Sequence, residues 1–176
     1  EKIIEPTIKG LQNLNTNFIG FLYVGLMIVN DEPFLIEYNV RMGDPECQTI
    51  LPKLKTDFYE IINSCVNKNL KSINIDWSKN RSLCIVLCSK GYPEKFTNNL
   101  EIMNLNQISL ESNEFIFHAG TKLNKTKIFS NGGRVLNFVV ISEEFKDSRF
   151  RAIEIIKKIN WTNGFFRKDI GFKVID

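Results

Sequence analysis

The residue types best suited to chemistry lie in one strand-like run, residues 35–41. Side chains alternate along a strand, so Glu37, Asn39 and Arg41 should project from the same face. Neighbours on that face are about 6.5 to 7 Å apart, which lets a carboxylate and an amide oxygen bind Mg²⁺ together. The spacing predicts a contribution to an ATP–Mg²⁺ site, with Arg41 able to clamp a carboxylate or phosphate. Taken alone, the alternation is explained better by an edge strand with one solvated face.

Two further segments carry polar groups at turns. Asp44, Pro45 and Glu46 form a helix-start signal, with an acidic cap, a proline at the first helical position and a carboxylate against the helix dipole. Acidic groups there would repel a phosphate and suit an amine. Gly132, Gly133 and Arg134 could offer N–H groups and a guanidinium to a phosphate, although turn chemistry accounts for these glycines equally well.

The first part of the chain must position the polar stripe. Apolar spacing predicts a short amphipathic helix within residues 1–14. Residues 18–29 and 34–40 are expected to form an antiparallel hairpin in which both strands are heavily buried. A helix should follow Glu46 and another should end near residue 67, after which the polar stretch 67–80 indicates a domain boundary.

The second half is predicted to be a small α+β module. Asn131 and Gly132 are expected to form a tight hairpin turn between its last two strands. A helix over 143–159 follows from apolar residues at helical spacing. The predicted strands are 82–88, 114–118, 127–130 and 133–141.

Composition excludes several classes of function. The chain has 176 residues and 43% hydrophobic content, enough for a real core. Its 23 basic and 20 acidic residues leave a net charge of only +3, which indicates neither nucleic-acid nor membrane-surface binding. The longest apolar run, 18–29, is too short to cross a bilayer. Four cysteines without a zinc-binding pattern favour a reducing, cytoplasmic setting.

Five segments of the sequence resemble, in order, the glycinamide ribonucleotide synthetases of the ATP-grasp superfamily. Residues 37–48 are similar to the family pattern E-F-N-x-R-[FM]-G-D-P-E-x-Q. The other four segments are 20–27, 89–93, 117–121 and 132–136, so the resemblance covers nearly the whole chain. It implies an α+β fold in which residues 1–68 end an ATP-grasp domain and 69–176 form the family's small carboxyl-terminal domain.

The resemblance also implies an activity and a set of site residues. Glu37 and Asn39 match the family's magnesium ligands, with Mg²⁺ or Mn²⁺ as the metal. Arg41 and Asp44 would be catalytic, and with Gly43 they would face glycine and 5-phosphoribosylamine. The segment 132–134, Gly132, Gly133 and Arg134, would complete the substrate site. The implied enzyme is a cytoplasmic ATP-dependent carbon–nitrogen ligase of purine biosynthesis.

The same resemblance predicts that this chain is inactive alone. The family's nucleotide lid and amino-terminal domain precede the matched residues, so the missing amino-terminal part of the same polypeptide is an expected partner beside ATP, glycine and phosphoribosylamine. Two alternatives stay open. One is another ATP-grasp ligase with the same Glu-x-Asn metal pair but a different acid and amine. The other is a non-catalytic piece that binds a partner chain.

Overall fold

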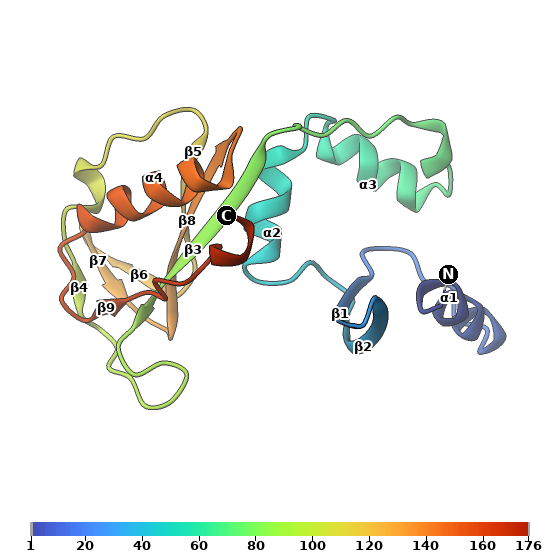
Figure 1. Cartoon of the computed structure of the whole chain (residues 1–176), viewed down its shortest axis with the longest axis horizontal. Coiled ribbons are helices and arrows are strands. Elements are labelled where there is room, and N and C mark those ends of the chain that lie inside the picture. Colours follow the sequence, from blue (N-terminus) through green and yellow to red (C-terminus); the bar gives the residue numbers. More distant parts are fainter. Residues whose placement is uncertain (1, 176) are drawn as a thin grey trace. The chain divides into compact units, whose positions relative to one another are not determined.

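The computed structural model of the protein describes residues 2–175 and separates into two units (Figure 1). The first unit comprises Glu1–Cys47 and Leu54–Trp77, and the second comprises Gln48–Lys53 and Ser78–Asp176. Antiparallel strands and helices occur in both, which confirms the expected α+β class. Within the described part of the chain, no helix combines the length and apolar character needed to span a membrane.

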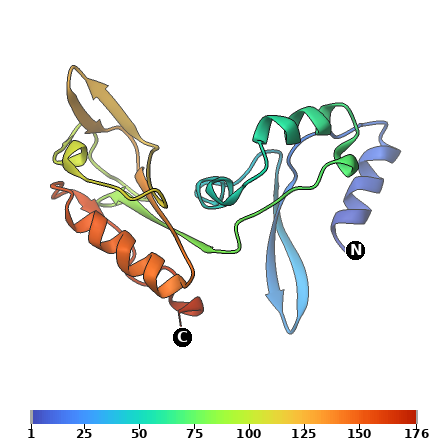
Figure 2. The same cartoon turned by 90° about the horizontal axis from the view of Figure 1, so that it is seen from above.

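The first unit opens with helix α1, Ile4–Asn13, followed by the hairpin of β1, Tyr23–Val29, and β2, Glu32–Asn39 (Figure 2). The hairpin turn consists of Asn30 and Asp31, whose φ angles are 50° and 62°. Both residue types tolerate left-handed backbone, and two such residues in succession match the twist of paired strands. The predicted helix and hairpin are therefore confirmed.

The expectation that both hairpin strands are heavily buried is wrong. Their sheet has two strands, so each strand pairs along one edge and most apolar side chains stay accessible. The apolar run misled the prediction, because alternation and hydrophobicity do not reveal how many strands a sheet contains. The exposed apolar residues of the two strands are Leu26, Met27, Ile28, Val29, Phe34, Leu35, Ile36 and Tyr38.

Two helical segments follow the hairpin as expected. Helix α2 spans Glu46–Ile50 and continues as a 3-10 turn over Leu51–Lys53, where Pro52 prevents a regular helix. Helix α3 spans Phe58–Val66. Its start is fixed by Asp57, whose Oδ1 accepts a hydrogen bond of 2.7 Å from the N–H of Tyr59.

The second unit is built on a four-stranded antiparallel sheet in the order β5-β8-β3-β9. Helix α4, Phe145–Lys157, packs on β3 and β8 (Figure 1). Leu83, Ile85, Phe138, Ala152 and Ile155 meet in this core and are at most 5% exposed, which accounts for the stability of the layer. The strands are β3 Arg81–Ser89, β5 Glu114–His118, β8 Arg134–Ser142 and β9 Gly164–Phe165.

A three-stranded sheet in the order β4-β7-β6 completes the second unit. The expected hairpin turn at Asn131 and Gly132 is wrong, because β7 and β8 belong to different sheets. The actual hairpin joins β6 to β7 through Lys125 and Thr126. The N–H of Asn131 instead bonds the carbonyl of Gly120 at 2.8 Å. The elements are β4 Glu101–Ile102, β6 Thr121–Asn124 and β7 Lys127–Ser130, with 3-10 turns at Leu105–Gln107 and Phe172–Val174. A further 3-10 turn, Leu70–Ser72, belongs to the first unit.

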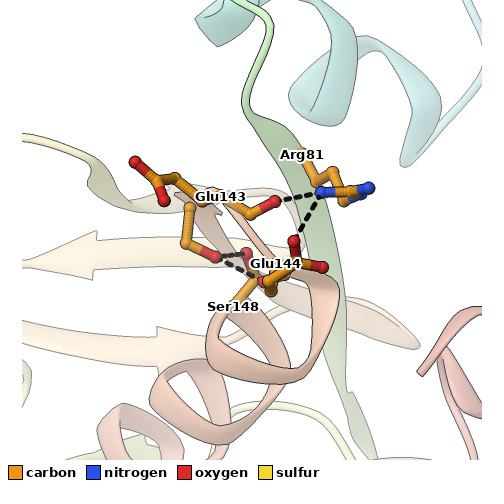
Figure 3. A network of polar contacts seen from close by, with 5 residues as sticks. Arg81, Glu143, Glu144 and Ser148 are labelled. Carbon is orange, nitrogen blue, oxygen red and sulfur yellow. Dashed lines mark hydrogen bonds and ion pairs between the residues drawn. The ribbon is translucent and has the colours of Figure 1, made fainter. Parts of the chain in front are cut away.

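A polar network fixes the start of α4 against β3 (Figure 3). Arg81 donates from Nη1 to the backbone oxygen of Glu143 and, at 3.2 Å, to Oε1 of Glu144. The hydroxyl of Ser142 donates to the backbone oxygen of Glu144 and lies 2.6 Å from the hydroxyl of the buried Ser148. These contacts satisfy polar groups where strand β8 turns into the helix.

An ion pair with a buried carboxylate joins β5 to α4. The carboxylate of Glu114 is 2% exposed and receives two hydrogen bonds from Arg151, at 2.5 and 3.0 Å, and one from the N–H of Glu111 at 3.0 Å. Hydrogen bonding from Arg151 is the largest cause that lowers the pKa of Glu114 below its ordinary value. The pair therefore stabilises the fold above that ordinary value, and the contribution is lost as the pH falls through the folded pKa.

We expect Arg151→Met to lower the free energy of unfolding by about 3 kcal/mol at neutral pH, because it leaves a buried carboxylate without its cation. Lys157→Met, which breaks an exposed pair with Glu154, is the matched control and should change stability little. Urea unfolding monitored by Trp161 fluorescence, with Trp77 replaced by Phe, measures the second unit. Equal midpoints for the two variants would contradict the assignment. The difference should shrink in acid, where Glu114 is protonated.

Candidate functional site

The carboxylate and amide singled out by the sequence lie side by side on β2. Nδ2 of Asn39 donates to Oε1 of Glu37 at 3.3 Å, so both side chains occupy the same face of the strand. Glu37 is exposed and Asn39 is half-buried. The two oxygen-bearing groups are therefore close enough to act on one ligand.

Strand β1 leaves room for this pair. Gly25 lies opposite Glu37 in the ladder, and Tyr23 lies opposite Asn39. A Cβ atom on Gly25 would come within 2.9 Å of Cγ of Glu37, closer than such atoms pack. The ladder also shifts register between Gly25 and Leu26, and such a bulge can redirect a side chain. Glycine at position 25 thus lets the carboxylate lie across the neighbouring strand.

The donor set fits a magnesium ion. Carboxylate and amide oxygens are hard ligands, and Mg²⁺ usually keeps waters and phosphate oxygens beside one or two protein carboxylates. Residues 2–175 contain no group of three or more His, Cys, Asp or Glu side chains that could form a closed metal cage. Glu37 and Asn39 offer two oxygen ligands of this kind, and an ion held by them would take its other ligands from outside the described residues. Arg41, two residues further, is exposed and donates to the carbonyl of Met42 at 3.0 Å.

A second carboxylate, that of Glu46, lies near this pair. The hydroxyl of Tyr23 donates to Oε1 of Glu46 at 3.4 Å. The carboxylate also lies over Gly43, where a Cβ atom would be 2.2 Å from its Oε2. The N–H of Cys47 bonds the carbonyl of Gly43 at 2.9 Å and closes the turn that carries the exposed Asp44. Helix α2 begins at Glu46, so Pro45 lies before the helix and not at its first position.

Tyr23 was not among the residues selected from the sequence, yet it bonds the carboxylate of Glu46, and its pKa responds to the charges of both Glu46 and Glu37. The negative charge of Glu46 is the largest cause that raises the pKa of Tyr23, followed by burial, and the charge of Glu37 adds a smaller effect in the same direction. Both charges disfavour the phenolate. The phenol is therefore neutral at physiological pH and remains a hydrogen-bond donor.

The glycine-rich segment of the second unit is held by neighbouring loops. Ser89 donates from Oγ to the carbonyl of Gly132 and from its N–H to that of Gly133, both at 2.8 Å. Gly120 donates to the carbonyl of Arg134 at 2.9 Å. Segments 89–93, 117–121 and 132–134 therefore meet at one end of the four-stranded sheet. In the first unit, Glu37 contacts Asn39, Gly43 lies beside the carboxylate of Glu46, and Arg41 bonds its own neighbour Met42. In the second unit, Gly132, Gly133 and Arg134 lie beside the loops that carry Ser89 and Gly120.

We expect Glu46→Gln to lower the pKa of Tyr23 toward that of an ordinary tyrosine, because the largest cause of the shift is removed. Glu60→Gln, an exposed change on α3 in the same unit, is the control and should leave the pKa unchanged. NMR titration of tyrosine labelled at Cζ resolves the individual phenols. An unchanged Tyr23 titration in Glu46→Gln would show that the two side chains do not meet.

Comparison with known proteins identifies the family. The family model "Phosphoribosylglycinamide synthetase, C domain" matches residues 82–173, and "Phosphoribosylglycinamide synthetase, ATP-grasp (A) domain" matches residues 1–47. The phosphoribosylamine–glycine ligases of Fusobacterium nucleatum and Agrobacterium fabrum are 42% and 40% identical over 97% and 99% of this chain. The chain spans 40% and 41% of their lengths.

A solved structure gives the same result. The crystal structure of phosphoribosylamine–glycine ligase from Thermotoga maritima matches 94% of this chain with a TM-score of 0.76 and 29% sequence identity, and the match covers 40% of that chain. The structural match and the sequence matches therefore point to the same family. This chain belongs to the phosphoribosylglycinamide synthetase family.

Proposed function

We propose that this chain is the carboxyl-terminal part of a ligase that joins glycine to 5-phosphoribosylamine at the expense of ATP. The products are glycinamide ribonucleotide, ADP and phosphate, in de novo purine biosynthesis. The observation that carries the proposal is the pairing of Glu37 and Asn39 on β2, in a chain that belongs to this family. The ligases matched above have this activity in their names, and the chain spans about 40% of their length.

The proposed reaction has two steps. A carboxylate oxygen of glycine attacks the γ-phosphorus of ATP, the bond to ADP breaks, and glycyl phosphate forms. The amine of phosphoribosylamine then attacks the carbonyl carbon, phosphate leaves, and the amine loses a proton to give the amide. The site must neutralise crowded oxyanions and keep water from the acyl phosphate.

Each candidate residue has a role that its position supports. Glu37 and Asn39 would hold Mg²⁺ or Mn²⁺, which neutralises phosphate oxygens when bound. Arg41 and Gly43 would face glycine and the ribosyl substrate, together with Asp44. The role of Asp44 follows from its charge, because a carboxylate beside Glu46 attracts an amine more readily than a phosphate. Gly132, Gly133 and Arg134 would bind a substrate anion.

The rest of the polypeptide is the proposed partner of the first unit. We infer that residues 1–68 complete an ATP-grasp domain and that 69–176 form the carboxyl-terminal domain. Exposed apolar side chains on both strands of the hairpin support this, because contiguous apolar surface of this kind marks an interface. The preceding part of the parent protein would cover it. Free thiols at all four cysteines support a cytoplasmic location.

The test is ADP and amide formation by the full-length parent, with radiolabelled glycine. We expect ADP release to require both glycine and phosphoribosylamine, and to fall at least about a hundredfold in Glu37→Gln, since electrostatic stabilisation of this kind accounts for factors of 10² to 10³. Glu32→Gln, at the start of the same strand, is the matched control and should keep wild-type activity.

Two results would overturn the proposal. ADP release that does not depend on glycine would remove the ligase assignment, and full activity of Glu37→Gln would remove the metal role. The 176-residue chain provides a further control. We expect no glycine-dependent ADP release from it, because the family's nucleotide lid lies in the preceding part of the polypeptide.

A further inference from the structure

Ser89 occupies an unusual position at the end of β3. It is 0% exposed, and it makes two hydrogen bonds to consecutive peptide groups of the glycine-rich segment. Its hydroxyl holds the carbonyl of Gly132, and its N–H holds the carbonyl of Gly133, each at 2.8 Å. One buried residue thus fixes the orientation of two adjacent peptide planes.

That orientation determines where the N–H groups point. In a planar trans peptide the N–H lies opposite the carbonyl of the preceding residue. Because the carbonyls of Gly132 and Gly133 both face Ser89, the N–H groups of Gly133 and Arg134 both point away from it. The N–H of Gly133 has no acceptor among residues 2–175. A donor held in this way is available to an acceptor brought by a ligand.

Close packing opposes rotation of the peptide planes of residues 132–134. The ring of Tyr92 lies against Gly133, where a Cβ atom would be 2.0 Å from Cδ2. On the other side, a Cβ atom on Gly132 would lie 3.1 Å from Cα of Gly120. A side chain at position 133 would therefore displace the Tyr92 ring, and one at position 132 would push against Gly120. The loops that carry Ser89, Tyr92 and Gly120 thus pack closely around the segment. The local turn chemistry predicted from the sequence does not account for these contacts.

The charges around the segment favour an anion. Arg134 directly follows Gly133, and Lys90 directly follows Ser89. Lys90 is exposed, and no carboxylate of the described part of the chain pairs with it. The N–H of Gly133 beside two cationic residues is an arrangement suited to binding phosphate.

We propose that Ser89 is a positioning residue, which holds Gly132, Gly133 and Arg134 in the conformation that binds the phosphate group of phosphoribosylamine. This inference rests on the proposed function and assigns one substrate group to the second unit. Ser89 does not touch the substrate. It acts through the peptide planes that it orients.

The first experiment uses NMR of the ¹⁵N-labelled 176-residue chain titrated with ribose 5-phosphate, and needs no ligase activity. We expect the amide signals of Gly133 and Arg134 to shift, with a dissociation constant that rises about three- to tenfold in Ser89→Ala, the range of one lost hydrogen bond. Ser148→Ala removes an equally buried, hydrogen-bonded hydroxyl from α4. It should lower stability in the same way and leave the dissociation constant unchanged.

The second experiment separates the ribosyl phosphate from the phosphates of ATP. In the full-length parent, Ser89→Ala should raise the KM for phosphoribosylamine and leave the KM for ATP unchanged. Equal rises in both constants would contradict the assignment. So would wild-type affinity of Ser89→Ala for ribose 5-phosphate, or the absence of shifts at Gly133 in the wild-type chain. Any of these results in an active ligase would overturn this inference and leave the proposed function standing.

Discussion

The register of the β1–β2 hairpin is the constraint on which the candidate metal site depends. It places Gly25 opposite Glu37 and Tyr23 opposite Asn39. A slip of one residue would turn Glu37 and Asn39 to the other face of the strand, away from the space above Gly25. The two-residue turn at Asn30 and Asp31 sets the pairing as far as Leu26 and Leu35, and the bulge between Gly25 and Leu26 then shifts the register so that Gly25 pairs with Glu37.

Both units use glycine in the same physical way. At Gly25 and Gly43, the absence of a side chain leaves the space in which the side chains of Glu37 and Glu46 lie against the backbone. In the second unit, Gly132 and Gly133 let the backbone approach Gly120 and the ring of Tyr92. A polar group or ligand then meets peptide atoms directly, and conformational freedom matters less than space.

Local sequence patterns predicted the helices, the β1–β2 hairpin and the longer strands of the second unit, whereas the short strands β4, β6 and β9 were not predicted. Alternation alone placed Glu37 and Asn39 on one face. The predictions that failed depended on contacts between segments far apart in the sequence. The burial of the hairpin was wrong because an apolar run does not tell how many strands pair. The turn at Asn131 was wrong because turn chemistry does not tell which strands a turn connects. Tyr23 could have been found as the residue two before Gly25, once the register was known, whereas the hydrogen bonds of Ser89 required the fold.

The measurement that tests the central claim most directly is the affinity of the full-length parent for Mn²⁺, determined by electron paramagnetic resonance in the presence of ADP. Glu37→Gln should weaken binding about tenfold or more, since even changes to groups that only support metal ligands cost 10- to 100-fold. Glu32→Gln should bind as the wild type does. Equal affinity of wild type and Glu37→Gln would show that the carboxylate on β2 does not hold the metal.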